Sequence, residues 1–135
     1  MISQLSISAP HQGLHEITPD VAAVVSESDL KEGLCTVFIK HTSASLLIQE
    51  NADPLAARDL EQWLNRLVAE NDQLYTHTSE GPDDMPSHIK STLTATSVAI
   101  PIINGQLALG TWQGVFLWEH RRANMQRTVI VHTGV

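Results

Sequence analysis

The feature that most limits the fold is a strand–turn–strand pattern in the last third of the chain. Over residues 95–102, apolar side chains alternate with small or polar ones, as expected of a strand with one buried face. The pair Asn104-Gly105 predicts a two-residue type I′ turn, which joins antiparallel strands. The return strand is expected to run from Gln106 through Trp118, with Gly110 and Gly114 allowing bends or bulges. This end of the chain should therefore form antiparallel β-structure.

Helices are predicted between these strands and an earlier set of extended segments. The other expected strands span residues 4–8, 14–17, 34–41, 44–49 and 127–133. The clearest helix spans 54–69, where apolar residues recur at helical intervals and Asp53-Pro54 supplies a cap and a first-turn proline. Shorter helices are expected after Thr18-Pro19 and over 86–93. The sequence thus predicts one domain, residues 1–135, of α+β class, with mostly antiparallel β-sheets packed against two to three helices.

The composition excludes several classes of protein. A chain of 135 residues that is 42% hydrophobic and 17% charged is typical of one folded domain. A net charge of -7 argues against non-specific nucleic-acid binding, which needs clustered cations. No apolar run reaches the roughly 18 residues of a membrane span, and the first residues lack a signal-peptide pattern, so we expect no membrane partner and a cytoplasmic location. The single Cys35 excludes a disulfide framework and is expected to be buried packing.

Three of the seven histidines lie at the ends of predicted elements. His41 ends an apolar strand face, and His120 ends a strand face expected to carry residues 112, 114, 116 and 118. His88 lies in the short helix that follows an acidic loop. Three neutral imidazoles with an open coordination position suit Zn²⁺ or a similar metal, although each ring is equally explained as a buried hydrogen-bonding group. The other four, His11, His15, His77 and His132, are expected to have ordinary structural roles.

Hydroxyl and acidic groups lie beside these histidines. The segment 41–45 places Thr42, Ser43 and Ser45 next to an imidazole, which suits anion or phosphate binding more than nucleophilic catalysis. Glu50 ends an apolar strand and has no evident structural reason to be there. The loop 80–86 contains two prolines and a glycine, and we expect it to border a pocket. Asp84 in this loop is expected either to cap the short helix or to contact the His88 site.

Several blocks of the chain resemble the YjbQ-like family, whose members are described as secondary thiamine-phosphate synthases. The matching blocks are residues 41–45, 49–54, 83–91, 110–114 and 119–121, and the stretch 97–113 also resembles the family's signature region. The resemblance covers nearly the whole chain and is most specific over 41–121. It implies an α+β fold whose sheets pack around a threefold axis, giving a homotrimer.

The resemblance also implies a pocket and a reaction. Its expected metal ligands are His41, His88 and His120, holding a divalent cation such as Zn²⁺ or Mg²⁺. The implied reaction joins hydroxymethylpyrimidine diphosphate to thiazole phosphate and releases pyrophosphate, as a weak or secondary activity. The residues expected to bind these substrates are Thr42, Ser43, Ser45, Trp112, Gln113 and Arg121, with Trp118 beside the heterocycles.

Two other functions stay open from the sequence. One is metal-assisted hydrolysis or transfer on another small anionic metabolite, with Glu50 or Asp84 as general base. The other is a non-catalytic trimeric protein that binds a metabolite or a metal. With a net charge of -7, binding of a phosphorylated substrate in any of these schemes would depend on the metal.

Overall fold

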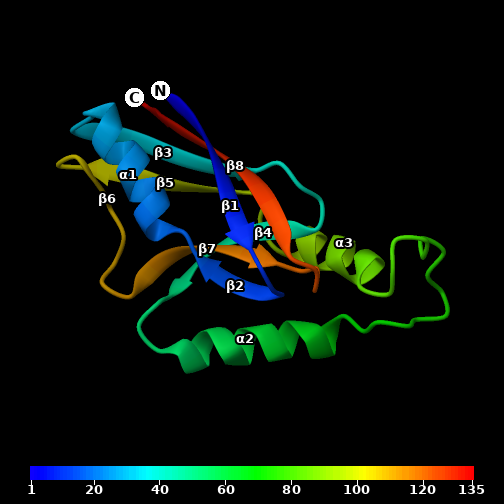
Figure 1. Cartoon of the computed structure of the whole chain (residues 1–135). Helices are drawn as coiled ribbons and strands as arrows, with labels where there is room; N and C mark the ends of the chain where they lie inside the picture. Colours follow the sequence, from blue (N-terminus) through cyan, green and yellow to red (C-terminus); the bar gives the residue numbers. More distant parts are fainter.

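Two antiparallel sheets and three helices form the fold (Figure 1), and the computed structural model describes all 135 residues. The strands are β1 (Ile2–Ala9), β2 (Gly13–Glu16), β3 (Glu32–Ile39), β4 (Ala44–Glu50), β5 (Ser97–Ile103), β6 (Gln106–Leu107), β7 (Gln113–Glu119) and β8 (Met125–Gly134). The helices are α1 (Thr18–Ser28), α2 (Pro54–Leu67) and α3 (Asp84–Leu93). The α+β class predicted from the sequence is confirmed.

The five-stranded sheet has the order β1-β8-β3-β5-β6, and the three-stranded sheet has the order β2-β7-β4. Every strand pair is antiparallel. The two ends of the chain therefore lie side by side, as Figure 1 shows, and the Met1 amino group donates to the Thr133 carbonyl at 2.7 Å. None of the three helices is long and apolar enough to cross a membrane.

The main core lies between the two sheets and is closed by α1. Val21, Val24 and Val25 of α1 are buried in it, which confirms the face predicted for that helix. Cys35 on the central strand β3 is fully buried there, and burial raises the pKa of its thiol to about 11. A buried, protonated thiol is a packing group, as the sequence predicted.

A second, smaller cluster joins α2 to the outer face of the small sheet. Leu64 of α2 packs with Val68 and with Trp118 of β7. The helix begins at Pro54 because the Asp53 carboxylate accepts the Leu55 N–H at 2.9 Å, as the predicted cap requires. The expected apolar stripe is only partly covered, since Leu67 is 56% exposed.

The prediction of one long return strand from Gln106 through Trp118 is wrong. β6 has only two residues, and after a loop over 108–112 the chain enters β7, which belongs to the other sheet. The loop is closed locally, because the Gly110 N–H donates to the Gln113 Oε1 at 2.8 Å. Trp112 is therefore outside the strand and 63% exposed, while Phe116 and Trp118 are buried. The expected shared aromatic face is thus broken at Trp112.

The outer face of the five-stranded sheet carries exposed apolar side chains. On β3, Leu34 and Phe38 alternate with the buried core residues, and each is 45% exposed. On the neighbouring strand β5, Ile103 is 55% exposed. The solvated face of an antiparallel sheet usually carries polar side chains, and this apolar sheet face differs from that rule.

Candidate metal centre

Two histidines and one aspartate meet where the loop after α2 returns to the start of α3. The Asp84 Oδ2 lies 2.9 Å from the His77 Nε2 and 3.2 Å from the His88 Nε2. These three ligand atoms lie within 4.8 Å of one another. Asp84 and His88 share a helix face because they are four residues apart on α3. Gly81, with φ of +104°, lets the loop turn back so that His77 reaches them. We call these residues the histidine–aspartate triad.

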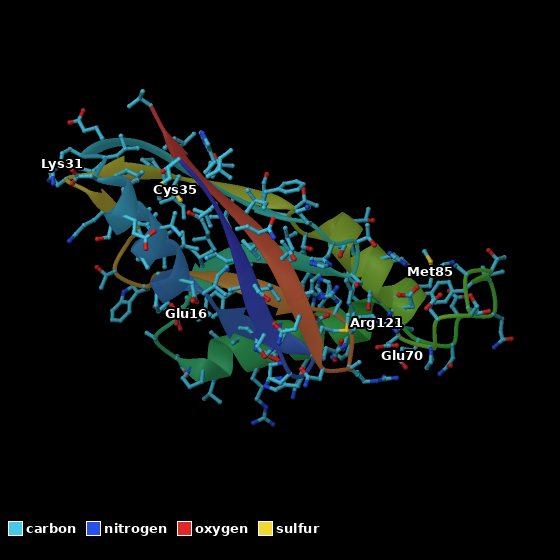
Figure 2. All side chains as sticks on the ribbon, turned by 45° about the horizontal axis from the view of Figure 1, so that its top comes forward. Glu16, Lys31, Cys35, Glu70, Met85 and Arg121 are labelled. Atoms are coloured by element: carbon cyan, nitrogen blue, oxygen red, sulfur yellow. The ribbon has the colours of Figure 1, made fainter.

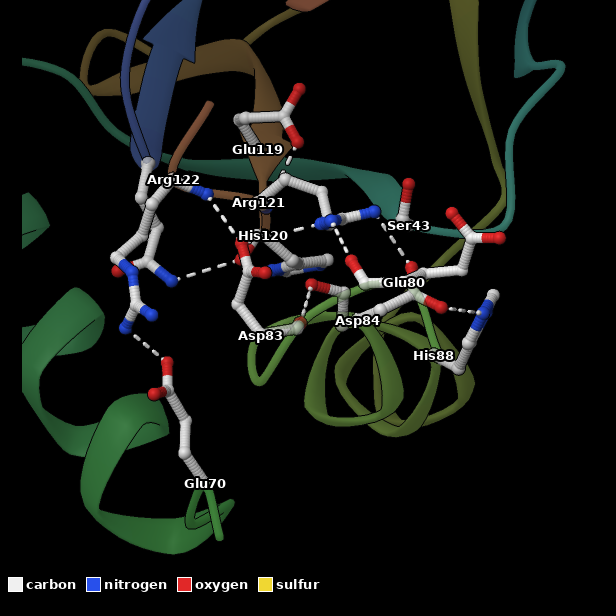
Figure 3. Close-up of polar contacts among 12 residues, drawn as sticks. Ser43, Glu70, Glu80, Asp83, Asp84, His88, Glu119, His120, Arg121 and Arg122 are labelled. Carbon is white, nitrogen blue, oxygen red and sulfur yellow. Dashed lines mark hydrogen bonds and ion pairs between the residues drawn. The ribbon is translucent and has the colours of Figure 1, made fainter. Parts of the chain in front are cut away.

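Arg121 holds the triad's carboxylate in place (Figure 3). Its Nη1 donates to the Asp84 Oδ1 at 2.8 Å, so Oδ2 is left for the two histidines. Its Nη2 donates to the Glu80 carbonyl at 2.8 Å, which ties the loop to the segment after β7. Asp84 is 5% exposed. The carboxylate therefore has a fixed support of the kind that orients metal ligands.

Asp83 makes a second link between the same two segments. Its Oδ2 accepts the Arg122 N–H at 2.9 Å and lies 3.2 Å from the Arg121 Nε. Burial by itself would raise the pKa of Asp83, but these hydrogen bonds and the Arg121 charge together lower it below its usual value. Asp83 is therefore an anionic anchor for the loop. In Figure 2, Arg121 lies with Met85 and Glu70 at the α3 end of the molecule, away from Lys31.

The hydrogen bonds of His88 turn an unprotonated ring nitrogen toward the Asp84 carboxylate. The His88 Nδ1 is 3.0 Å from the Thr42 carbonyl, which only accepts, so the ring proton lies on Nδ1. The Nε2 of the neutral ring then carries a lone pair that faces the Asp84 carboxylate, another acceptor. Either a second proton on His88 or a metal ion resolves this contact. Two imidazoles and one carboxylate suit zinc or a similar transition metal better than Mg²⁺, which prefers oxygen ligands.

The spacing of the donor atoms also fits a metal. Neighbouring ligand atoms on an ion at about 2.1 Å are about 3.0 to 3.4 Å apart in octahedral or tetrahedral coordination. The two nitrogen–oxygen distances in the histidine–aspartate triad, 2.9 and 3.2 Å, are close to that range. His77 is half-exposed, so the triad is open to solvent.

A polar cavity lies on the other side of His88. Its volume is about 340 Å³, and it is lined by His41, Thr42, His88, Ser91, Thr92 and Thr96. We call it the hydroxyl-lined cavity. Of the residues expected to form the site, the structure thus brings His41, Thr42 and His88 to one cavity. Asp84 contacts His88 beside this cavity, and Arg121 in turn contacts Asp84.

The three histidines expected to bind one metal do not gather at one point within the chain, because His120 is held elsewhere. It is 1% exposed, and its Nε2 lies 2.9 Å from the Ser45 hydroxyl. Its ring packs 5.6 Å from that of Trp118 under α2. Burial, with smaller effects of the Lys90 and Arg127 charges, lowers the pKa of His120 to about 3. Ser45 is also fully buried, so neither side chain faces the cavity.

His41 lines the cavity but has its own set of partners. Its Nε2 accepts the Thr128 N–H at 2.7 Å, and its Nδ1 lies 3.4 Å from the Arg127 Nη1. Burial and the Arg127 charge lower the pKa of His41. Ser43, expected to bind substrate, is buried and accepts from the Arg127 Nη2 at 2.9 Å. Only His88 of the three expected ligands is therefore part of the histidine–aspartate triad.

Three further expected residues lie at the opposite end of the small sheet. Glu50 is paired in register with Gln113, next to the exposed Trp112, while the other end of β4 leads back to the cavity. At about 3.3 Å per residue, the length of β4 separates the two ends by roughly 20 Å. The structure therefore does not bring Glu50, Trp112 or Gln113 to the triad.

His77 is the site residue that the sequence analysis missed. The sequence predicts an ordinary structural role for it, because it lies in a polar loop with no local motif. The available signal was its position directly before the stiffened segment 80–86, which was expected to border a pocket. Asp84 contacts the His88 site, and it makes no side-chain hydrogen bond to a helix N–H. Of the two roles left open for Asp84, the structure therefore supports the site contact.

Comparison with known proteins places the chain in a family. A family model described as UPF0047 protein YjbQ-like matches residues 3–134. The UPF0047 protein sll1880 of Synechocystis sp. is 57% identical over 95% of this chain and 87% of its own length. YjbQ of Escherichia coli O157:H7 is 40% identical over 93% of this chain and 91% of its own. The chain belongs to the UPF0047 YjbQ-like family.

Solved structures of YjbQ-like proteins have the same fold. An uncharacterized YjbQ/UPF0047-family protein of Clostridium acetobutylicum has a TM-score of 0.85 and 36% identity, covering 99% of each chain. The conserved hypothetical protein TT1486 of Thermus thermophilus has a TM-score of 0.87 and 34% identity, covering 98% of this chain and 99% of its own. The names of these relatives state no reaction, so the function has to be argued from the site.

Proposed function

We propose that the chain is a metal-dependent enzyme that acts on a small phosphorylated or other anionic metabolite beside the histidine–aspartate triad. The observation that carries this proposal is the meeting of His77, Asp84 and His88 at one carboxylate oxygen. Arg121 supports that carboxylate, and the hydroxyl-lined cavity adjoins the triad through His88. Supported metal ligands next to a polar cavity are typical of an active site.

Each residue of the site has a definite task in this scheme. A divalent ion bound to the triad would neutralise and orient the substrate's anionic oxygens. The Thr42 carbonyl fixes the His88 proton on Nδ1 and so leaves Nε2 free as a ligand. Arg121 holds the Asp84 carboxylate in position by donating to its Oδ1. The cavity supplies hydroxyl groups from Thr42 and Thr96 as further donors to a bound anion.

The reaction to test first comes from the resemblance to secondary thiamine-phosphate synthases. It joins hydroxymethylpyrimidine diphosphate to thiazole phosphate with release of pyrophosphate, and we propose it as a weak or secondary activity. The metal would have a large part in such a reaction, because the leaving group is a diphosphate and the chain's net charge is -7. If this pair of substrates is not turned over, hydrolysis or transfer on another anionic metabolite is the next class to assay.

The experiment compares Asp84→Asn with a matched control, Asp59→Asn, at an exposed position of α2. Purified proteins are loaded with Zn²⁺ and dialysed, and bound metal is measured by elemental analysis. Asp84→Asn should lose at least about tenfold in metal affinity, because the site loses its only carboxylate ligand. Pyrophosphate release should fall by at least about the same factor, while Asp59→Asn retains both properties.

Metal content decides between the possible roles. If Asp84→Asn kept wild-type metal binding and activity, the histidine–aspartate triad would not be the functional metal site. Stoichiometric metal that depends on Asp84, with no turnover of any phosphorylated metabolite, would favour a protein that binds a metabolite or metal without catalysis.

We also propose that copies of the chain associate through the apolar sheet face of Leu34, Phe38 and Ile103. These three side chains are about half-exposed on adjacent strands of the five-stranded sheet. Exposed apolar side chains on one face of a sheet are typical of a subunit interface. The family resemblance implies three copies, and we propose a homotrimer.

A further inference from the structure

We propose that the hydroxyl-lined cavity contains a binding site for a phosphoryl group, formed by donors of His41 and Arg127. This inference deepens the proposed function and rests on it for the link to catalysis, but the site uses none of the triad's metal ligands. It begins from a mismatch in the hydrogen bonds of His41.

The proton of His41 is located by its backbone partner. The Thr128 N–H, which only donates, lies 2.7 Å from the His41 Nε2. Nε2 must therefore carry a lone pair, and a neutral imidazole then has its single proton on Nδ1. A doubly protonated ring would set an N–H against the Thr128 N–H, so the neutral ring is the one that fits.

The His41 Nδ1–H faces a second donor. Its polar neighbour is the Arg127 Nη1 at 3.4 Å, and a guanidinium has no acceptor. The rest of that guanidinium is occupied, because Nε and Nη2 donate to the Glu119 carboxylate at 2.6 and 2.5 Å. The Arg127 side chain is only 3% exposed. Two donors, one just after β3 and one on β8, therefore lie 3.4 Å apart with no acceptor between them.

An oxyanion supplies the missing acceptor. One oxygen can accept from both the His41 Nδ1–H and the Arg127 Nη1–H, and such charge-assisted hydrogen bonds are the strong ones. His41 lines the cavity, whose volume of about 340 Å³ is many times that of a water molecule.

The free hydroxyl groups of the cavity suit a phosphoryl group. Thr92 donates to the His88 carbonyl at 2.9 Å and Ser91 to the Ala44 carbonyl at 3.3 Å, so both are occupied. The hydroxyls of Thr42 and Thr96 have no such partner within the chain and are free to donate. With the His41 and Arg127 donors they make four, and the three terminal oxygens of a phosphoryl group can accept from all of them. His88 then borders the same group and places it beside the triad.

The test measures binding of inorganic phosphate and pyrophosphate to metal-free protein by isothermal titration calorimetry. His41→Gln keeps an acceptor for the Thr128 N–H but loses the donor at Nδ1, whereas His41→Asn places an amide N–H near that position. We expect His41→Gln to bind at least about tenfold more weakly and His41→Asn to stay within about threefold of wild type. Arg127 is not substituted, because its loss would leave Glu119 buried without a partner.

Two further measurements keep this inference separate from the proposed metal function. Asp84→Asn should retain phosphate binding in the metal-free protein even where it loses metal. In the ¹⁵N spectrum of the histidines, phosphate should shift the protonated Nδ1 of His41 and leave its Nε2 nearly unchanged. Absence of phosphate binding to the wild type, unchanged binding in His41→Gln, or loss of binding in Asp84→Asn would overturn the assignment, and the acceptor would then be water.

Discussion

At the scale of single residues, hydrogen-bond partners decide what each histidine can do. His88 has its proton fixed on Nδ1 by the Thr42 carbonyl, which turns a lone pair toward Asp84. His41 has its lone pair fixed on Nε2 by the Thr128 N–H, which turns a donor toward Arg127. Two histidines of one cavity therefore present opposite groups, His88 a lone pair and His41 an N–H donor.

His120 is buried without a charged partner, which makes it a source of acid sensitivity. Its pKa in the folded chain is about 3, against 6.5 for the unfolded chain. Between these values only the unfolded chain binds the proton, so stability is lost as the pH falls from 6.5 toward 3. We expect the free energy of unfolding to fall by about 1.4 kcal/mol per pH unit from this group over much of that range.

Urea unfolding of His120→Gln between pH 6.5 and 4 checks this prediction. Glutamine retains a polar partner for the Ser45 hydroxyl and does not titrate, so the variant should show a flatter dependence of stability on pH. His11→Gln, at an exposed position in the turn after β1, serves as the control and should follow the wild type. Equal pH slopes in His120→Gln and wild type would contradict the assignment.

At the scale of elements, the start of α3 is used to anchor the site as well as to begin a helix. Asp83 lies at the cap position, but its carboxylate accepts from Arg122 and pairs with Arg121 instead of capping. Asp84 belongs to the triad and also pairs with Arg121. The N-terminal end of the helix is thus tied to the segment after β7, which keeps the triad's ligands on a rigid support.

Helix α2 depends on one buried residue for its attachment to the small sheet. Leu64 is 2% exposed, whereas Leu67, one turn later, is 56% exposed. Leu64→Ala should therefore lower the free energy of unfolding by about 2 to 5 kcal/mol, because it opens a cavity against Trp118. The matched variant Leu67→Ala should cost less than about 1 kcal/mol. Urea denaturation of both variants measures the difference, and equal losses would contradict this view of the helix.

At the scale of the whole molecule, the two faces of the five-stranded sheet differ in what covers them. The inner face packs against α1 and the small sheet, with residues such as Cys35 and Val37 fully buried. The outer face presents Leu34, Phe38 and Ile103 at about half exposure. Burial of that hydrocarbon is favourable at about 25 cal/mol per Å², which supports association of copies.

Light scattering tests this association directly. We expect a mass three times the 14.8 kDa of one chain at micromolar concentration. Phe38→Glu places a charge in the apolar sheet face and should shift the protein toward single chains. Gln62→Glu adds the same charge at an exposed position of α2 and should leave the mass unchanged. A wild-type mass of one chain would contradict the proposed trimer.

The sequence by itself determined those features whose cause is local. The 3.6-residue period and Asp53-Pro54 were enough for α2, and the Val21, Val24 and Val25 face was enough for α1. The strand patterns and the short turn at Asn104-Gly105 were enough for an antiparallel α+β fold. Periodicity, caps and tight turns act over a few residues, so a single sequence contains them completely.

The tertiary structure decided which side chains meet. His77 joins Asp84 because the loop reverses at Gly81. The strand β7 does not continue β6 as predicted, because the chain turns over 108–112 into the other sheet. The same packing buries His120 on Ser45 and sets His41 against Arg127, from segments far apart in the sequence. Such contacts depend on how whole elements pack against one another, and no local pattern in the chain records that arrangement.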